Sequence, residues 1–398
     1  MPQHERVDHA AGGALTAPAG ARRPRGALVV ALVASATLVL AAPGIGSARS
    51  ALRAAFPGTF SRLIEGGLAL ALLIALGIGV ARIRTARALR YALLVIAIAA
   101  AWAYSVATGS ADPAILAVER VHFVEYGAIA WLFLRVWRDR PDASSLVAPV
   151  LAAGLVGIGD EAFQWFLPAR VGELADVALN FVAIACGLAF GAALTPPAAI
   201  LGRWRSASIR LVTRLVAATI VALAAFVHLV HLGHRVEVPR VGTFESRYTP
   251  LELTSLDYER GEVWRRDPPL VRPPRFSRED QYMTEGLQHV QARNQSWAGG
   301  DFATALRENA ILERYFGSVL DAPSYVSKTG HRWSPEQRAD GERRAAVSPD
   351  RPFESRAFPY PIFVVSPLVV WGGALGAALG VWLVGGWIAG RASDRDRA

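Results

Sequence analysis

Three apolar stretches of the chain contain polar side chains that could bind a ligand or transfer a proton. The first reads ERVHFVEY, the second GDEAFQWF and the third ELADVALN, and one arginine lies between the second and the third. Carboxylates and amides accept hydrogen bonds, arginine binds phosphate or carboxylate, and histidine exchanges protons near neutral pH. We therefore predict a ligand-binding set made of Arg120, His122, Glu125, Tyr126, Glu161, Gln164, Arg170, Asp176 and Asn180. These residue types do not by themselves assign a catalytic residue.

Each stretch places its polar residues on one face of a helix. The spacing is i, i+3, i+4 for His122, Glu125 and Tyr126; i, i+3 for Glu161 and Gln164; and i, i+4 for Asp176 and Asn180. Side chains three or four residues apart lie on the same side of a helix. Because ionisable groups are costly in a bilayer, they usually face the interior of a bundle or a watery cavity. We expect three polar stripes that face one another.

The elements that carry these stripes are predicted to be membrane-spanning helices. Of 398 residues, 53% are hydrophobic and 19% charged, whereas soluble proteins average about 45–50% and about 25%. Apolar runs cover residues 26–42, 63–80, 91–107, 114–136, 146–166, 175–195, 209–232 and 362–389. Each is close to the length that a helix needs to cross about 30 Å of hydrocarbon, and none alternates as a barrel strand does. The predicted fold is all-α, a polytopic membrane bundle of about eight spans.

Arginine clusters predict the orientation of this bundle. The net charge is +9, and Lys328 is the only lysine. The clusters between alternate runs are Arg82, Arg84, Arg87 and Arg90; Arg135, Arg138 and Arg140; and Arg203, Arg205, Arg210 and Arg214. The positive-inside rule then places both termini in the cytoplasm and residues 233–361 outside the inner (cytoplasmic) membrane. Because the arginines lie between apolar runs, they indicate topology, and no nucleic-acid partner is expected.

This topology divides the chain into segments. We expect residues 1–25 to be a disordered cytoplasmic leader, 26–200 a bundle of six spans, 201–232 the seventh span, and 362–398 the eighth span with a cytoplasmic tail. The basic flank and first apolar run could also be a signal peptide, which would leave the later topology unchanged.

The external segment, residues 233–361, is expected to be mainly helical or irregular. It should start extended, with turns at Pro239, Gly242 and Pro250. A helical hairpin is predicted over 280–320 with a break at Gly299–Gly300, and Ser334-Pro335 is expected to begin a further short helix.

The same topology predicts the depth of the polar stripes. His122 lies near the outer end of its span, Glu161 near the outer end of the next, and Asp176 at the outer start of the third. We expect the three stripes to share one chamber beneath the outer headgroups, with Arg170 above it. The alternative is that these groups only join helices, with Arg120 or Arg170 paired to Glu161 or Asp176.

These motifs resemble the VanZ-like family, membrane proteins named for a member linked to teicoplanin resistance. The resemblance rests on RVHFVEY, EAFQWFLPAR and DVALNFVAIACG and covers roughly residues 65–195. Arg120 stands where a lysine is usual, and Ala169 where a glycine usually precedes the motif arginine. The resemblance implies a multi-span membrane protein tied to cell-envelope or glycopeptide-resistance phenotypes. It implies no agreed reaction.

Our leading hypothesis is a binding function. The outward-facing polar pocket would hold the polar head of an envelope lipid or a lipid-linked cell-wall precursor, with membrane lipids as its other partners. A second hypothesis is an enzyme in which His122 and Glu161 act as base and acid while Arg170 stabilises negative charge. A transporter is the third. No cofactor or metal is expected, and the sequence does not predict an oligomeric state.

Several weaker signals favour structural roles. His228, His231 and His234 could place two ligands on one metal, but interfacial histidines are the favoured interpretation. Gly187 and Gly191, and likewise Gly372, Gly376 and Gly380, have the spacing of close helix packing, with dimerisation as the alternative role. Cys186 is the single cysteine, so no disulfide forms within the chain.

Overall fold

The computed structural model describes residues 23–167, 170, 172–269, 278–324, 327–345, 352–358 and 360–397. Most of the predicted leader, residues 1–22, therefore lies outside the described residues, and so do Pro168 and Ala169 of the motif that resembles the VanZ-like family.

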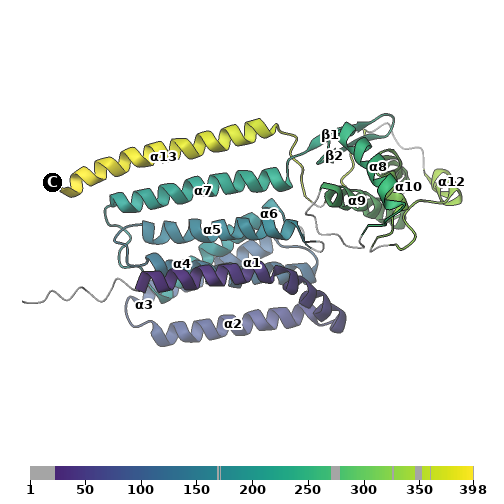
Figure 1. Ribbon diagram of the computed structural model, residues 1–398. Helices are drawn as coiled ribbons and strands as arrows, with labels where there is room; N and C mark the ends of the chain where they lie inside the picture. The colour runs from purple at the N-terminus through teal and green to yellow at the C-terminus, as the bar shows by residue number, and fades with distance from the viewer. Residues whose placement is uncertain are drawn as a thin grey trace, which may run out of the picture.

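A bundle of long helices makes up most of the described chain. It consists of α1 (Arg23–Ala55), α2 (Phe60–Arg82), α3 (Arg87–Thr108), α4 (Pro113–Trp137), α5 (Ser144–Trp165), α6 (Leu174–Leu194), α7 (Ser206–Val230) and α13 (Pro367–Arg397). Figure 1 shows these helices side by side, with the start of α1 and the end of α13 at one end of the bundle. The described residues between α7 and α13, within 231–366, fold at the opposite end, and we name them the α7–α13 domain.

Seven of the described helices, all of these except α4, are long and apolar enough to cross a membrane. This confirms a multi-pass membrane helix bundle. The eight spans predicted from the sequence also included α4, which is the one long helix of the bundle outside this set of seven. At 25 residues α4 is as long as α7, but it contains Glu119, Arg120 and Glu125. It packs against α1, α5 and α6 inside the bundle.

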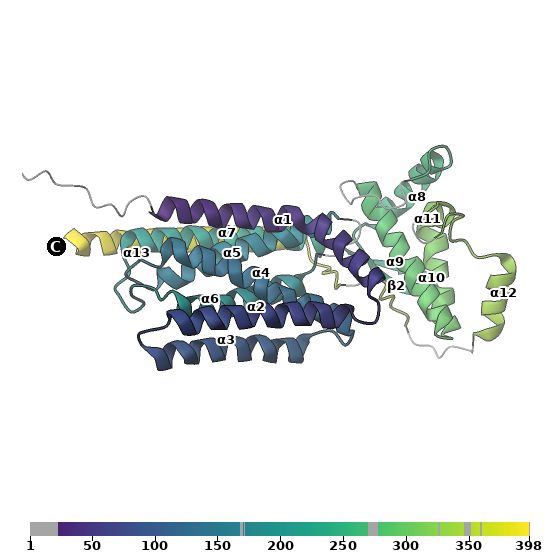
Figure 2. The same cartoon turned by 90° about the horizontal axis from the view of Figure 1, so that it is seen from below.

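The first helix continues beyond its predicted end. We expected the span to stop at Pro43, but α1 runs through this proline to Ala55. A proline inside a helix removes one backbone hydrogen bond and bends the helix without necessarily ending it. Figure 2 shows the last turns of α1 directed away from the axis of its first part. In these turns Arg49 lies within electrostatic range of Arg170.

Glycines allow α4 and α6 to approach closely. A Cβ atom at Gly187 would lie 2.0 Å from the Cα of Gly127, and one at Gly191 would lie 2.7 Å from the Trp131 ring. The packing role predicted for Gly187 and Gly191 is therefore confirmed. The prediction of packing within the chain was wrong for the second set, because Cβ atoms at Gly372, Gly376 and Gly380 would meet no described atom within 4 Å. Dimerisation through these glycines stays a prediction.

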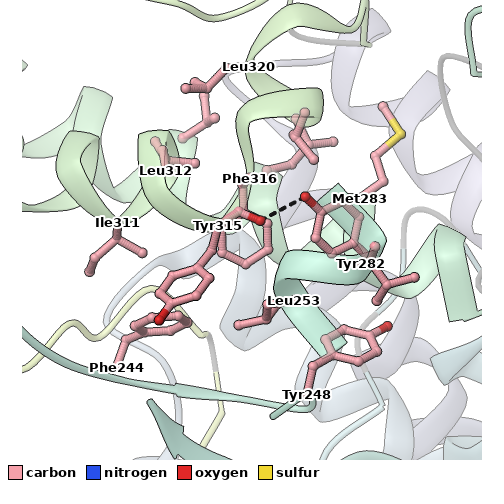
Figure 3. Close-up of a cluster of buried hydrophobic side chains, with 14 of the residues drawn as sticks. Phe244, Tyr248, Leu253, Tyr282, Met283, Ile311, Leu312, Tyr315, Phe316 and Leu320 are labelled. Atoms are coloured by element: carbon pink, nitrogen blue, oxygen red, sulfur yellow. Dashed lines mark hydrogen bonds between the residues drawn. The ribbon is translucent and has the colours of Figure 1, made fainter. Parts of the chain in front are cut away.

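The α7–α13 domain begins with an antiparallel hairpin, so the chain is not entirely α-helical. Strands β1 (His234–Val238) and β2 (Gly242–Ser246) pair with Val236 opposite Phe244. Helices α8 (Pro250–Trp264), α9 (Arg278–Ala298), α10 (Phe302–Tyr315), α11 (Gly317–Asp321) and α12 (Pro335–Arg344) follow. The hairpin and helices α8 to α11 share an aromatic core. Figure 3 shows this core, in which the Tyr282 hydroxyl donates to the backbone carbonyl of Tyr315 at 2.8 Å.

Local sequence signals explain where the elements of this domain begin. The predicted break at Gly299–Gly300 is confirmed, with Gly300 at φ +82°, and the Ser334 side chain caps α12. Pro250 was expected in a turn, but it is the first residue of α8, which Thr249 and Glu252 cap reciprocally.

The last long helix starts later than predicted, at Pro367 and not at residue 362. Phe363 instead pairs with Leu232 in a parallel bridge beside the end of α7. Pro361 and Pro367 explain this difference, because the residue before a proline is disfavoured in a helix.

Candidate functional site

The three predicted polar stripes meet in the structure. Nδ1 of His122 on α4 donates to Oδ1 of Asn180 on α6 at 2.7 Å. The Tyr126 hydroxyl donates to Oδ2 of Asp160 on α5 at 2.6 Å. Nδ2 of Asn180 donates to Oε1 of Glu161 at 3.4 Å. Hydrogen bonds thus connect α4, α5 and α6, and they do so at the end of the bundle that carries the α7–α13 domain.

Gln164 occupies the centre of this network. Its Nε2 donates to Oδ2 of Asp160 at 2.8 Å and to Oε1 of Glu161 at 3.3 Å. Its Oε1 accepts two hydrogen bonds from Arg170, at 2.9 Å from Nε and 2.5 Å from Nη2. Gln164 therefore uses both sides of its amide to connect the α5 carboxylates with the arginine of the α5–α6 connection.

Burial separates the site into two parts. The buried network consists of Tyr126, Asp160, Glu161, Gln164 and Asn180, each 5% exposed or less. The rim consists of His122, Glu125, Arg170 and Asp176, which are half-buried. The structure therefore closes the lower part of the predicted pocket with its own hydrogen bonds, and the rim is the part that a ligand could reach.

Two carboxylate oxygens of the buried network lack a protein partner. Oδ1 of Asp160 and Oε2 of Glu161 are inaccessible, and neither has a hydrogen-bond partner among the residues that the structure describes. A buried polar atom without a partner costs free energy, and an unpaired buried charge costs more. Both oxygens can therefore accept a proton or a hydrogen bond from a donor that reaches them.

Acidic groups outnumber basic groups at the site. Glu125 lies within electrostatic range of His122, Asp160 and Arg170, and Asp176 lies within range of His122 and Arg170. The site thus holds four carboxyl groups, on Glu125, Asp160, Glu161 and Asp176. The basic groups nearby are His122, Arg170 and Arg49, which lies within electrostatic range of Arg170. Arg170 lies within electrostatic range of all four carboxyl groups. The excess of carboxyl groups favours ligands that donate hydrogen bonds or carry positive charge.

Arg120 is the one predicted site residue that lies elsewhere. Its Nε donates to Oγ of Ser105 at 2.9 Å, and its Nη1 forms an ion pair with Glu65 at 2.7 Å. Arg120 is two residues from His122, and successive residues of a helix are 100° apart, so the two side chains point in nearly opposite directions. The expectation that Arg120 would bind the same ligand or pair with Glu161 or Asp176 is not supported by this placement.

Asp160 was not among the predicted site residues, although it makes two of the shortest hydrogen bonds in the network. The signal was present in the sequence, since Asp160 and Gln164 have the i, i+4 spacing that identified the other pairs.

His231, which follows α7, was considered as an interfacial residue, but it joins three segments. Its Nδ1 donates to the carbonyl of Pro361 at 2.8 Å, and its Nε2 accepts from the backbone N–H of Leu174 at 3.0 Å. The ring therefore caps the N-terminus of α6, the helix that carries Asp176 and Asn180. Burial and the nearby Arg247 guanidinium lower the pKa of His231, although its bond to Pro361 opposes them. The described residues contain no group of three histidine, cysteine or acidic side chains placed to hold a metal ion.

The α7–α13 domain is attached directly above the site. The guanidinium of Arg247 lies 5.2 Å from the ring centre of Trp165, the last residue of α5, and donates to the backbone carbonyls of Leu229 and Val230. Tyr360 packs edge-on against the same tryptophan. The domain therefore contacts the helix that supplies Asp160, Glu161 and Gln164.

Glu173 lies at the start of α6 beside the rim. Burial, helped by the nearby carboxylates of Asp176 and Glu119, raises its pKa to about 7. A carboxyl group with this pKa changes its charge near neutral pH, at the surface that a ligand would approach.

Comparison of the chain with protein-family models, with curated proteins and with solved structures finds no match. The structure itself shows a multi-pass membrane helix bundle in which a polar network joins α4, α5 and α6.

Proposed function

We propose that the chain is a VanZ-like protein of the cytoplasmic membrane whose rim binds the polar head of an envelope lipid or a lipid-linked cell-wall precursor. In this proposal α4 is an eighth span, both termini are cytoplasmic, and the α7–α13 domain lies outside. The even number of crossings agrees with the placement of the start of α1 and the end of α13 at one end of the bundle.

The observation that carries the proposal is a half-buried rim of ionisable side chains above a buried network. In this network two carboxylate oxygens have no hydrogen-bond partner among the described residues. Interhelical hydrogen bonds alone would hold α4, α5 and α6 together, but they would not require four carboxyl groups in a membrane bundle.

The charge balance indicates the chemistry of the head. Carboxylates accept hydrogen bonds from hydroxyl, amide and ammonium groups, while the Arg170 guanidinium binds phosphate or carboxylate. A lipid-linked cell-wall precursor carries sugar hydroxyls and amide N–H groups next to phosphate, so one molecule supplies both kinds of partner. By holding such a lipid, the protein would influence the envelope and the response to antibiotics that bind it.

A binding measurement tests the role of the rim. Purified full-length protein in nanodiscs is titrated with a fluorescent lipid-linked disaccharide-pentapeptide. We expect Asp176→Asn to weaken binding at least tenfold, because it removes a rim carboxylate. Asp139→Asn, a matched change in the turn after α4 and at its far end from the rim, should bind as wild type does. Equal affinity for Asp176→Asn and wild type would refute the rim as the binding site.

The orientation has its own test. In a Cys186→Ala background, Gln295→Cys places a single thiol at an exposed position of α9. A membrane-impermeant maleimide should label it in intact cells, whereas labelling only after lysis would place the domain in the cytoplasm.

A membrane-embedded acid/base enzyme is the second candidate. It is favoured by His122, which lies within electrostatic range of both Glu125 and Asp176 in the rim. Incubation of the same lipid with the protein distinguishes the two functions, because only an enzyme yields a product that mass spectrometry can detect.

A further inference from the structure

A long apolar groove lies between α2 and α3, on a different face of α4 from the buried network. It encloses about 720 Å³. Its floor is formed by α4 and α6 where Gly127 meets Gly187. Apart from its two ends, the groove is lined almost entirely by alanine, leucine, isoleucine and aromatic side chains.

The groove has a length close to that of the hydrocarbon layer. Its lining on α2 extends from Glu65 to Arg82, and 17 residues at 1.5 Å per residue span about 25 Å. The hydrocarbon core of a bilayer is about 30 Å thick. The charged ends of the groove are therefore placed at the two boundaries of the apolar layer.

The walls of the groove open to the surface of the bundle. Leu72 is 36% exposed, Ile78 44% and Trp102 66%. In a membrane the surrounding medium is hydrocarbon, and water does not stay in an apolar space of this kind. Unfilled space would also cost the lining its dispersion contacts. A hydrocarbon chain that enters from the side would fill the groove without water and would restore the dispersion contacts of the lining.

The end of the groove nearer the α7–α13 domain carries both charges of an ion pair. Arg120 uses Nε and Nη1 toward Ser105 and Glu65, which leaves further N–H donors of its five. The side chains of Arg120 and Glu65 are 29% and 44% exposed. The pair therefore offers donors for a phosphate and a carboxylate for an ammonium group, side by side.

We propose that this groove binds one zwitterionic phospholipid of the phosphatidylethanolamine type, with one acyl chain between α2 and α3 and its headgroup on Arg120 and Glu65. This site is separate from the rim and does not depend on the function proposed for it. It gives Arg120 a lipid-binding role on the face of α4 where the structure places it.

Two tryptophan substitutions on α3 test the groove. Ala101 lines it, whereas the neighbouring Ala100 is exposed and lies outside it. Full-length protein is released from nanodiscs of equimolar phosphatidylethanolamine and phosphatidylglycerol and analysed by native mass spectrometry. We expect one retained phosphatidylethanolamine in wild type and in Ala100→Trp, and at least tenfold less in Ala101→Trp. Retention by Ala101→Trp equal to that of wild type, or retention of phosphatidylglycerol instead, would overturn the proposal.

A second measurement needs no substitution. Cys186 lines the groove and is the only cysteine of the chain. N-ethylmaleimide should modify it at least fivefold more slowly when phosphatidylethanolamine is added to delipidated protein in detergent. An unchanged rate of modification would contradict occupation of the groove by this lipid.

Discussion

Tyr126 and Asp160 form a 2.6 Å hydrogen bond between α4 and α5, and both side chains are almost completely buried. The same carboxylate oxygen accepts from Gln164, which in turn binds Arg170. The hydroxyl of Tyr126 is thus the first member of a chain of contacts that reaches the rim. It connects the packing of the bundle with the position of the arginine that a ligand would meet.

Removing this hydroxyl should weaken the bundle without emptying its core. We expect Tyr126→Phe to lower the free energy of unfolding by about 1 kcal/mol, because interhelical hydrogen bonds in membranes have about that value. Unfolding in mixed detergent with sodium dodecyl sulfate measures the change. Tyr104→Phe on α3 is the matched control and should have no comparable effect; equal stability of Tyr126→Phe and wild type would show that the bond contributes nothing.

Close packing of α4 on α6 should depend on Gly187. In Gly187→Ala the added methyl group would overlap the backbone at Gly127, and overpacking of this kind costs about 1–3 kcal/mol. The helices would separate, so His122 and Asn180 should also lose their hydrogen bond. Thermal unfolding and ligand binding report the two effects. The control is Gly380→Ala on α13, where a Cβ would meet no described atom within 4 Å, and it should change neither the unfolding temperature nor ligand binding. An unaffected Gly187→Ala protein would rule out the close crossing of α4 and α6.

His231 should control the order of the start of α6. His231→Ala removes the acceptor for the Leu174 N–H and the donor to Pro361. We expect backbone amides around residue 174 to exchange hydrogen at least tenfold faster, as followed by mass spectrometry. His228→Ala, at an exposed position of α7, provides the comparison and should exchange at the wild-type rate. Unchanged exchange in His231→Ala would mean that the cap has no role in ordering α6.

The α7–α13 domain should lose stability as the pH rises toward neutrality. Burial of Glu285 on α9 raises its pKa to about 7, although hydrogen bonds from Ser246 and Arg247 and the charge of His289 oppose the shift. The unfolded chain releases this proton near pH 4.5, so the folded form binds more protons between pH 4.5 and 7. The stabilisation is complete below about pH 4.5 and is lost as the pH rises through about 7.

Thermal unfolding at a series of pH values tests this behaviour. Glu285→Gln should flatten the decline between pH 4.5 and 7, whereas Glu259→Gln, at an exposed position of α8, should keep it. An identical decline in Glu285→Gln would assign the pH dependence to another group.

Helical spacing predicted much of the site because it determines which side chains share a face. The i, i+3 and i, i+4 pairs on α4, α5 and α6 do meet, and the short α5–α6 connection keeps Arg170 beside Gln164. The same geometry could have shown that Arg120 points away from His122. What spacing does not give is the partner on another helix: Glu65 is 55 residues from Arg120 along the chain.

Other features depended on packing that a single sequence does not reveal. The helix α1 was expected to end at Pro43, but it continues through this proline. The residues after Pro43 still form a helix as far as Ala55. The groove between α2 and α3 is lined by residues of α2, α3, α4 and α6, so no local sequence pattern predicts it. The closure of the buried network similarly depends on side chains from three helices.

Photocrosslinking tests the binding function of the rim most directly. A benzoylphenylalanine at position 175, exposed beside Asp176 in the first turn of α6, is compared with one at position 201, fully exposed between α6 and α7 at the other end of the bundle. Irradiation of intact cells followed by mass analysis identifies the attached lipid. We predict that position 175 captures a lipid-linked cell-wall precursor, that Asp176→Asn abolishes this capture, and that position 201 captures none. Attachment of only bulk phospholipid at both positions, unaffected by Asp176→Asn, would contradict the proposed function.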